Sequence, residues 1–116
     1  MLSLPPSVRI FLCRVPTDMR RSFDSLALMV EQVIGADPYS GHLFVFRNRR
    51  GDRVKILYWS RDGYALWYKR LEKGVFRFAS KGCDDGELSA VELAMALDGV
   101  DIRETTQRRR FSREKV

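Results

Sequence analysis

The sequence predicts an α+β fold: an antiparallel β-meander of about four to five strands with two main helices packed on it. Three observations lead to this prediction. Residues 18–34 carry apolar side chains at helical spacing, residues 43–78 hold short aromatic and apolar segments separated by turn residues, and residues 89–98 form a second helical segment with its own start signal. Helices that flank a run of strands are typical of a domain in which they cover the sheet.

The predicted strands and their turns come from local patterns of β-branched and aromatic residues. Five segments have this composition: residues 8–13, 43–47, 54–59, 64–71 and 75–78. The last four are separated by short turn segments that contain Gly51, Gly63 and Gly74, and Gly51 is available for the positive φ of a tight hairpin. We therefore expect three successive hairpin connections, and an antiparallel meander, over residues 43–78.

The first helix is predicted over residues 18–34. Its apolar positions recur at steps of four and three, as one face of an α-helix requires: Met19, Phe23, Leu26, Val30 and Val33. Thr17 or Asp18 is expected to cap the N-terminus by accepting the free amide hydrogens of the first turn. Gly35 is expected to end the helix in the left-handed conformation.

The second helix is predicted over residues 89–98. Ser89 and Glu92 have the spacing of a capping box, and Gly99 gives a stop signal. We assign residues 1–102 to a single α+β domain. Residues 103–116 have an excess of arginine and lysine and are predicted to form a basic, disordered C-terminal tail.

Composition narrows the class of protein. The chain has 116 residues and a net charge of +6, which favours acidic partners such as nucleic acids. It lacks the run of about 18 apolar residues that a membrane span needs, and its N-terminus does not resemble a signal peptide, so a cytoplasmic location without membrane contact is expected. Cys13 is expected to be a small buried side chain on a strand, and the two cysteines and one histidine do not make a zinc site.

Catalysis has little support in the sequence. His42, the sole histidine, has no nucleophile near it, and no glycine-rich phosphate loop is present. Asp18, Asp52 and Asp62 could bind a divalent metal for phosphoryl transfer, but each occupies a cap or turn position where aspartate is common for backbone reasons. We therefore expect a protein that is not an enzyme and uses no cofactor or metal.

A basic hairpin is the strongest candidate for a binding site. Arginine and lysine are concentrated around the predicted turn at residues 48–52, with further basic residues on the next strand, and such side chains bind phosphates. The predicted nucleic-acid-binding residues are Arg47, Arg49, Arg50, Arg53, Lys55, Lys69 and Arg70. Aromatic rings on the same strands could stack on unpaired bases or contact a protein, and Trp59, Trp67 and Tyr68 are the candidates for such a face, although any of them could be core instead.

Several segments together resemble one known family. They are Pro16–Asp24, Asp37–Arg53, Lys55–Trp59 and Leu66–Glu72. The chain is similar along residues 8–100 to the small TnpB-type accessory proteins of bacterial insertion sequences of family sixty-six, which share only a name with the RNA-guided nucleases called TnpB. The resemblance implies a role in DNA transposition beside a separately encoded transposase that carries the catalytic acidic residues, and it supplies no catalytic site or cofactor.

Two functions fit these observations. The first is a non-catalytic accessory protein that binds DNA through the arginine-rich hairpin, with the terminal repeats of the element as the expected target. The second is a protein-interaction adaptor that docks on the transposase or on a sister accessory protein of the same element, with the aromatic face as its interface and the arginines as its rim. The sequence does not decide between DNA and protein as the main partner, and it leaves the oligomeric state open.

Overall fold

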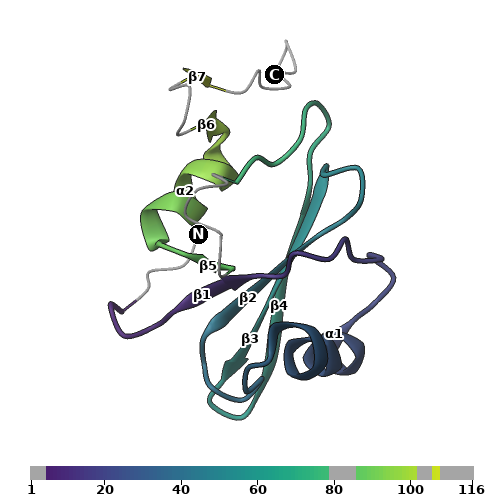
Figure 1. The fold of residues 1–116 in the computed structure, drawn as a ribbon, viewed down its shortest axis with the longest axis vertical. Helices are drawn as coiled ribbons and strands as arrows, with labels where there is room; N and C mark the ends of the chain where they lie inside the picture. The colour runs from purple at the N-terminus through teal and green to yellow at the C-terminus, as the bar shows by residue number, and fades with distance from the viewer. Residues whose placement is uncertain (1–4, 79–85, 102–105, 108–116) are drawn as a thin grey trace.

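A central sheet with one helix on each face forms the framework of the computed structural model, which describes residues 5–78, 86–101 and 106–107 (Figure 1). The sheet has five strands in the order β4-β3-β2-β1-β5. These strands are β1 (Ile10–Leu12), β2 (Leu43–Arg47), β3 (Arg53–Ser60), β4 (Gly63–Arg70) and β5 (Glu87–Leu88). The antiparallel hairpins β2–β3 and β3–β4 contribute the longest pairings, so the predicted α+β fold is confirmed.

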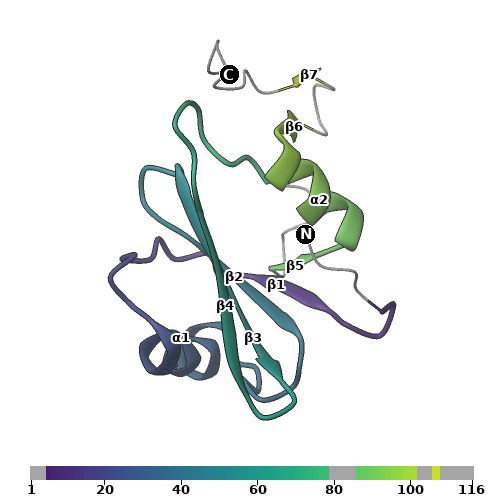
Figure 2. The same cartoon turned by 180° about the vertical axis from the view of Figure 1, so that it is seen from behind.

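Each face of the sheet has its own apolar core, and Figure 2 shows from behind that α1 and α2 lie on opposite sides of the sheet. On one face, Leu26 and Val30 pack with buried residues of β2 and β3 such as Phe44. On the other face, Leu93 and Leu97 pack with buried residues that include Ile56. Because a strand directs successive side chains to opposite faces, two covered faces explain why the predicted strands are apolar at nearly every position.

The first helix begins later than the sequence predicts. α1 spans Phe23–Met29 and continues as a π-helical turn, η1, over Val30–Ile34. The chain before α1 does not enter the helix because Asp18 bonds to the backbone amide of Arg20 at 2.9 Å and so folds residues 18–20 into a turn of its own. Gly35 ends the π-helical turn with a φ of 79°, as predicted.

The second helix agrees closely with the prediction. α2 spans Ala90–Asp98, and Ser89 and Glu92 form the reciprocal bonds of the capping box. Gly99 follows in the left-handed conformation, with a φ of 87°. The chain then enters a separate two-stranded sheet made of β6 (Val100–Asp101) and β7 (Thr106–Gln107).

Two details of the predicted meander are wrong. β1 pairs in parallel with β2, because the chain crosses over through α1 before it returns to the sheet. The predicted strand at residues 75–78 is not a strand. Phe76 is buried and its amide donates to the carbonyl of Gly51 at 2.8 Å, so the segment is held against the β2–β3 turn without a ladder of its own.

Two other predictions concern Cys13 and the C-terminal tail. Cys13 is buried just after β1, and burial raises the pKa of its thiol. The predicted tail, residues 103–116, lies outside the described residues except for the two residues of β7. Across the parts of the chain that the structure describes, no helix has the length and apolar character needed to cross a bilayer. The same parts hold no cluster of three or more His, Cys, Asp or Glu side chains suited to a metal ion.

Candidate nucleic-acid interface

The β2–β3 turn, residues 48–52, has a conformation fixed by the side chain of Asn48. Its Oδ1 accepts hydrogen bonds from the amides of Gly51 at 2.9 Å and Arg53 at 3.1 Å, while its Nδ2 donates to Asp52 at 2.8 Å. Gly51 has a φ of 82°, a conformation that glycine adopts without strain. Because the backbone of the turn is held at these points, Arg49 and Arg50 project from a defined base.

The charge on this turn is partly balanced by Asp52. Its pKa is lowered first by the hydrogen bond from Asn48 and further by the positive charges of Arg50 and Arg53, so the carboxylate stays ionised at neutral pH. Arg49 and Arg50 are exposed, and among the described residues neither side chain has a hydrogen-bond or ion-pair partner. These two guanidinium groups are therefore available to an external anion.

A second segment, the loop of residues 16–21, lies beside the turn and is attached to the sheet at two places. The amide of Thr17 donates to the carbonyl of Arg47 at 2.9 Å. The Nζ atom of Lys55 donates to the carbonyls of Met19 and Arg21, both at 2.7 Å. Lys55 is only 6% exposed, so its ammonium group is a structural cross-link between β3 and this loop.

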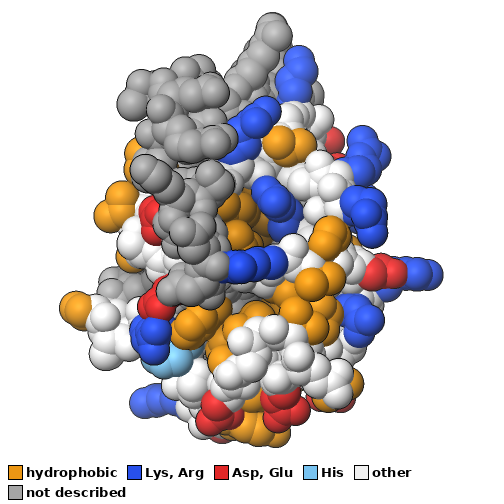
Figure 3. Space-filling view, viewed as in Figure 1, with side chains coloured by type: hydrophobic (Ala, Val, Ile, Leu, Met, Phe, Trp, Pro, Cys, Tyr) orange, Lys and Arg blue, Asp and Glu red, His pale blue; other side chains and the backbone are white. Residues whose placement is uncertain are grey.

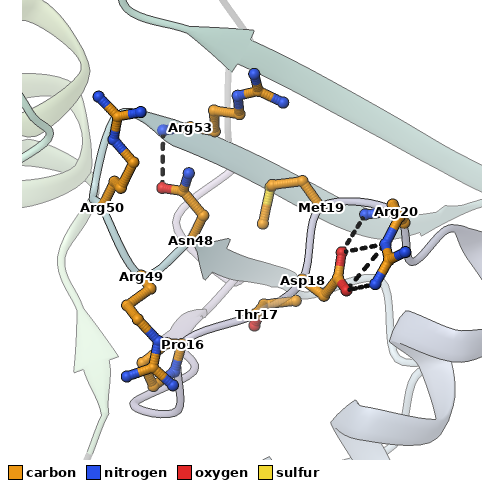
Figure 4. A pocket seen from close by; sticks show the side chains of 9 residues that line it. All are labelled: Pro16, Thr17, Asp18, Met19, Arg20, Asn48, Arg49, Arg50 and Arg53. Atoms are coloured by element: carbon orange, nitrogen blue, oxygen red, sulfur yellow. Dashed lines mark hydrogen bonds and ion pairs between the residues drawn. The ribbon is translucent and has the colours of Figure 1, made fainter.

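The turn and the loop together line a pocket of about 570 Å³ (Figure 4). Its lining residues are Pro16, Thr17, Asp18, Met19, Arg20, Asn48, Arg49, Arg50 and Arg53. In Figure 4, the side chain of Met19 points from the loop toward Asn48 of the turn. Arg49 lies next to Pro16, and Arg50 and Arg53 lie on the opposite rim. The pocket thus has arginines on its rim and a partly apolar wall.

Asp18 brings a negative charge to this pocket, but Arg20 neutralises it. The guanidinium group contacts both carboxylate oxygens, with an Nη2–Oδ2 distance of 2.7 Å and Nε distances of 3.1 Å. The side-chain hydrogen bonds from Arg20, followed by the bond from its backbone amide, lower the pKa of Asp18 to about 2. Four arginines and two aspartates, Asp52 included, leave a net charge of +2 around the pocket.

The structure gathers only some of the predicted nucleic-acid-binding residues into this site. Arg49, Arg50 and Arg53 line the pocket, and Arg53 also donates to the hydroxyl of Tyr68 at 3.3 Å. Arg47 instead donates to the carbonyl of Phe76 at 2.9 Å, which ties β2 to the segment after β4. Lys55 is buried and bonded to the loop of residues 16–21, so neither Arg47 nor Lys55 belongs to the pocket.

The two remaining basic residues lie at the end of β4. Lys69 and Arg70 are both exposed, and the register places Lys69 opposite Val54 and Arg70 opposite Arg53. Since neighbouring residues of a strand face opposite ways, Arg70 shares the face of Arg53 whereas Lys69 points to the other face. Arg70 forms an exposed ion pair with Glu72 at 3.1 Å.

The three candidate aromatic residues do not form one face. Trp67 is partly buried against the core beneath α2. Trp59 lies at the opposite end of β3 from the arginines, where it meets Tyr39 and Tyr64 edge to face with ring centroids 5.0 and 5.1 Å apart. Of the three candidates, Tyr68 is the one next to the pocket; it is 47% exposed and lies 4.8 Å from the Nζ atom of Lys55.

Sequence reasoning missed the loop of residues 16–21 as half of the site. The available signal was the segment Pro16–Asp24, which contributes to the family resemblance together with the arginine-rich turn. Nothing in the spacing of the two segments indicates that they meet, because their contact is made by tertiary bonds from Thr17 and Lys55.

The fold and the pocket together define a small basic α+β protein whose candidate site suits a polyanion. Residues 8–107 match the family described as "IS66 Orf2 like protein", and the chain belongs to this family. Family membership indicates an accessory role in the transposition of an insertion sequence, and proteins of this kind are generally non-catalytic.

Two curated relatives cover most of the chain. An uncharacterized protein of Sinorhizobium fredii, y4hO, is 38% identical over 103 residues, which is 89% of this chain and 90% of the relative. A second uncharacterized protein of the same organism, y4jC, is 35% identical over 101 residues, or 87% of this chain and 86% of the relative. No solved structure matches the chain.

Proposed function

We propose that this protein is a DNA-binding accessory factor of transposition, which contacts DNA phosphates through the arginine-lined pocket. The observation that carries the proposal is that Arg49, Arg50 and Arg53 line one pocket together with the loop of residues 16–21, on a turn whose backbone is held by hydrogen bonds. Guanidinium groups bind phosphates by paired hydrogen bonds, and these contacts supply most of the affinity in protein–DNA complexes.

The distribution of charge over the surface supports this proposal. In Figure 3, lysine and arginine side chains gather over the upper right of the molecule, the side on which Figure 1 places the β2–β3 turn, whereas acidic side chains are more frequent at the lower end. A protein with one basic side orients that side toward a polyanion as it approaches. Because Asn48 holds the backbone of the turn, binding has to order the arginine side chains but not the turn from which they project.

The experiment that tests the proposal is a charge reversal at the turn. The double variant Arg49→Glu with Arg50→Glu is expected to weaken binding to a DNA duplex and to lower the slope of log affinity against log salt by about 2, since each phosphate contact contributes close to one unit of slope. Fluorescence anisotropy at several salt concentrations measures both quantities. Unchanged affinity and slope in the double variant would contradict the assignment.

A matched control is available at the other end of β3. Arg61 is exposed and lies in the β3–β4 turn, far along the strand from Arg53. The single variants Arg50→Glu and Arg61→Glu change the net charge equally. We expect Arg50→Glu to weaken binding clearly more than Arg61→Glu; equal losses would mean that overall charge, and not the pocket, determines the affinity.

In this proposal the cutting and joining of DNA belong to the transposase of the element, and the terminal repeats are the expected DNA target.

A second candidate function is that of an adaptor that docks on the transposase or on a sister accessory protein. The cluster of Tyr39, Trp59 and Tyr64 favours it, because Tyr39 is 59% exposed and such residues are enriched at protein interfaces. Co-purification with the transposase after nuclease treatment, and its loss on Tyr39→Ser, would support this function.

A further inference from the structure

We propose that the arginine-lined pocket takes the end of a DNA strand by its terminal phosphate, an inference that rests on the proposed DNA-binding function and makes it more specific. The first reason is shape. The pocket is an open hollow of about 570 Å³ between two segments, a volume large enough for a nucleotide. An internal phosphate is linked to a sugar on both sides, whereas a terminal phosphate has one such link and can enter a recess.

The second reason is charge. A phosphomonoester carries between one and a half and two negative charges at neutral pH, and an internal phosphodiester carries one. The net charge of +2 around the pocket therefore matches a terminal phosphate more closely than a single internal one. Because Arg20 already neutralises Asp18, the carboxylate in the pocket does not cancel the three arginines from β3 and the turn.

The third reason is the chemical variety of the lining. Arg49, Arg50 and Arg53 offer donors to phosphate oxygens, while Pro16 and Met19 offer apolar surface to a sugar or base. Tyr68 lies directly beside the pocket through its bond with Arg53, and its half-exposed ring gives a surface on which an unpaired base can stack. A phosphate-binding rim next to an apolar wall and an aromatic ring suits a terminal nucleotide.

The test uses DNA molecules that differ only at their ends. A hairpin oligonucleotide with a dye in its loop is prepared with a 5′-phosphate, with a 3′-phosphate, or with hydroxyl groups at both ends, and a closed dumbbell of the same stem has no end at all. With the full-length protein, we expect a phosphate at one of the ends to strengthen binding at least about tenfold over the hydroxyl and dumbbell forms, the effect of one or more charge-assisted hydrogen bonds.

The outcomes separate this inference from the proposed function. Equal affinity for all four molecules would overturn end binding and leave DNA binding in place. A lack of binding to any of them would overturn both. A preference for the dumbbell or for the hydroxyl ends would also overturn the inference.

A conservative variant shows whether the pocket is responsible. The double variant Arg49→Lys with Arg50→Lys keeps both charges but replaces the forked donors that bind a phosphate in pairs. We expect this variant to lose most of the preference for a phosphorylated end, because lysine lacks the paired donors that grip a terminal phosphate. A preference that persists unchanged would place the end-binding site elsewhere and overturn the inference.

Discussion

The buried Lys55 offers the sharpest test of how the candidate site is built. In Lys55→Met the side chain keeps its length but loses the ammonium group, so the carbonyls of Met19 and Arg21 lose their donor. Two charge-assisted hydrogen bonds stabilise a fold by about 1.5–3 kcal/mol each. Part of this is offset, because a buried methionine has no desolvation cost and the loop carbonyls regain water. We therefore expect a loss of about 2–4 kcal/mol in the free energy of unfolding.

For a domain near 100 residues this loss corresponds to a fall in Tm of roughly 8–16 °C, which circular dichroism measures directly. Lys69→Met is the matched control, because Lys69 is exposed on the neighbouring strand and its replacement should change stability by less than about 0.5 kcal/mol. We also expect Lys55→Met to weaken DNA binding below its own Tm, since the loop that lines the pocket is released. A Tm within about 2 °C of the parent protein would refute the role given to Lys55.

Three further predictions concern the turns around the sheet. The pKa of Asp18 is lowered from 3.8 to about 2, so the stability that the ionised carboxylate contributes is present above about pH 4 and is lost as the pH falls toward 2. Asp18→Asn should therefore flatten the pH dependence of urea unfolding between about pH 4 and 2. An unchanged profile would contradict the ion pair of Asp18 with Arg20. Gly51→Ala should destabilise the fold by at least about 1 kcal/mol, because the φ of residue 51 is 82° and the new Cβ would lie 3.3 Å from the Cβ of Val75. A variant with the same Tm as the parent protein would argue against this turn conformation. Arg61 has a φ of 59°, so Arg61→Gly should raise the stability by up to about 1 kcal/mol in chemical denaturation, and a clear loss would show that the side chain has a structural role.

Local patterns were sufficient wherever a structure is determined by residues close together in the sequence. The capping box of Ser89 and Glu92 and the final glycine fixed the bounds of the second helix almost to the residue. The hairpins around Gly51 and Gly63 followed from turn residues between apolar runs. In each case the deciding hydrogen bonds join residues a few positions apart, and the sequence displays them directly.

Prediction failed where a distant segment decides the conformation. Residues 75–78 have the composition of a strand, yet Phe76 fills the core and bonds to Gly51, so no partner strand forms. The parallel pairing of β1 with β2 depends on the crossover through α1, which a strand of three residues does not reveal. The start of α1 was misplaced because the Asp18 turn competes with the helix for the same backbone amides.

The candidate site was half predictable for the same reason. The arginines of the turn are evident in the sequence. The sequence alone does not distinguish basic side chains that stay exposed from those that bond to the backbone of another segment, as Arg47 and Lys55 do. Lys55 resembles its basic neighbours, and only the carbonyls of a loop more than 30 residues away make it structural. The aromatic candidates divided in the same way, with Trp67 against the core and Tyr68 beside the pocket.

The central claim is that this protein binds DNA through the arginine-lined pocket, and one titration tests it most directly. The full-length protein is added to labelled duplexes of the element's terminal repeats and to a scrambled duplex, at roughly 50 and 200 mM salt, and fluorescence anisotropy is recorded. We predict binding at the lower salt that weakens by at least about tenfold at the higher salt, and that Arg49→Glu with Arg50→Glu abolishes most of this difference. An absence of binding at 50 mM salt would contradict the account and favour the adaptor function.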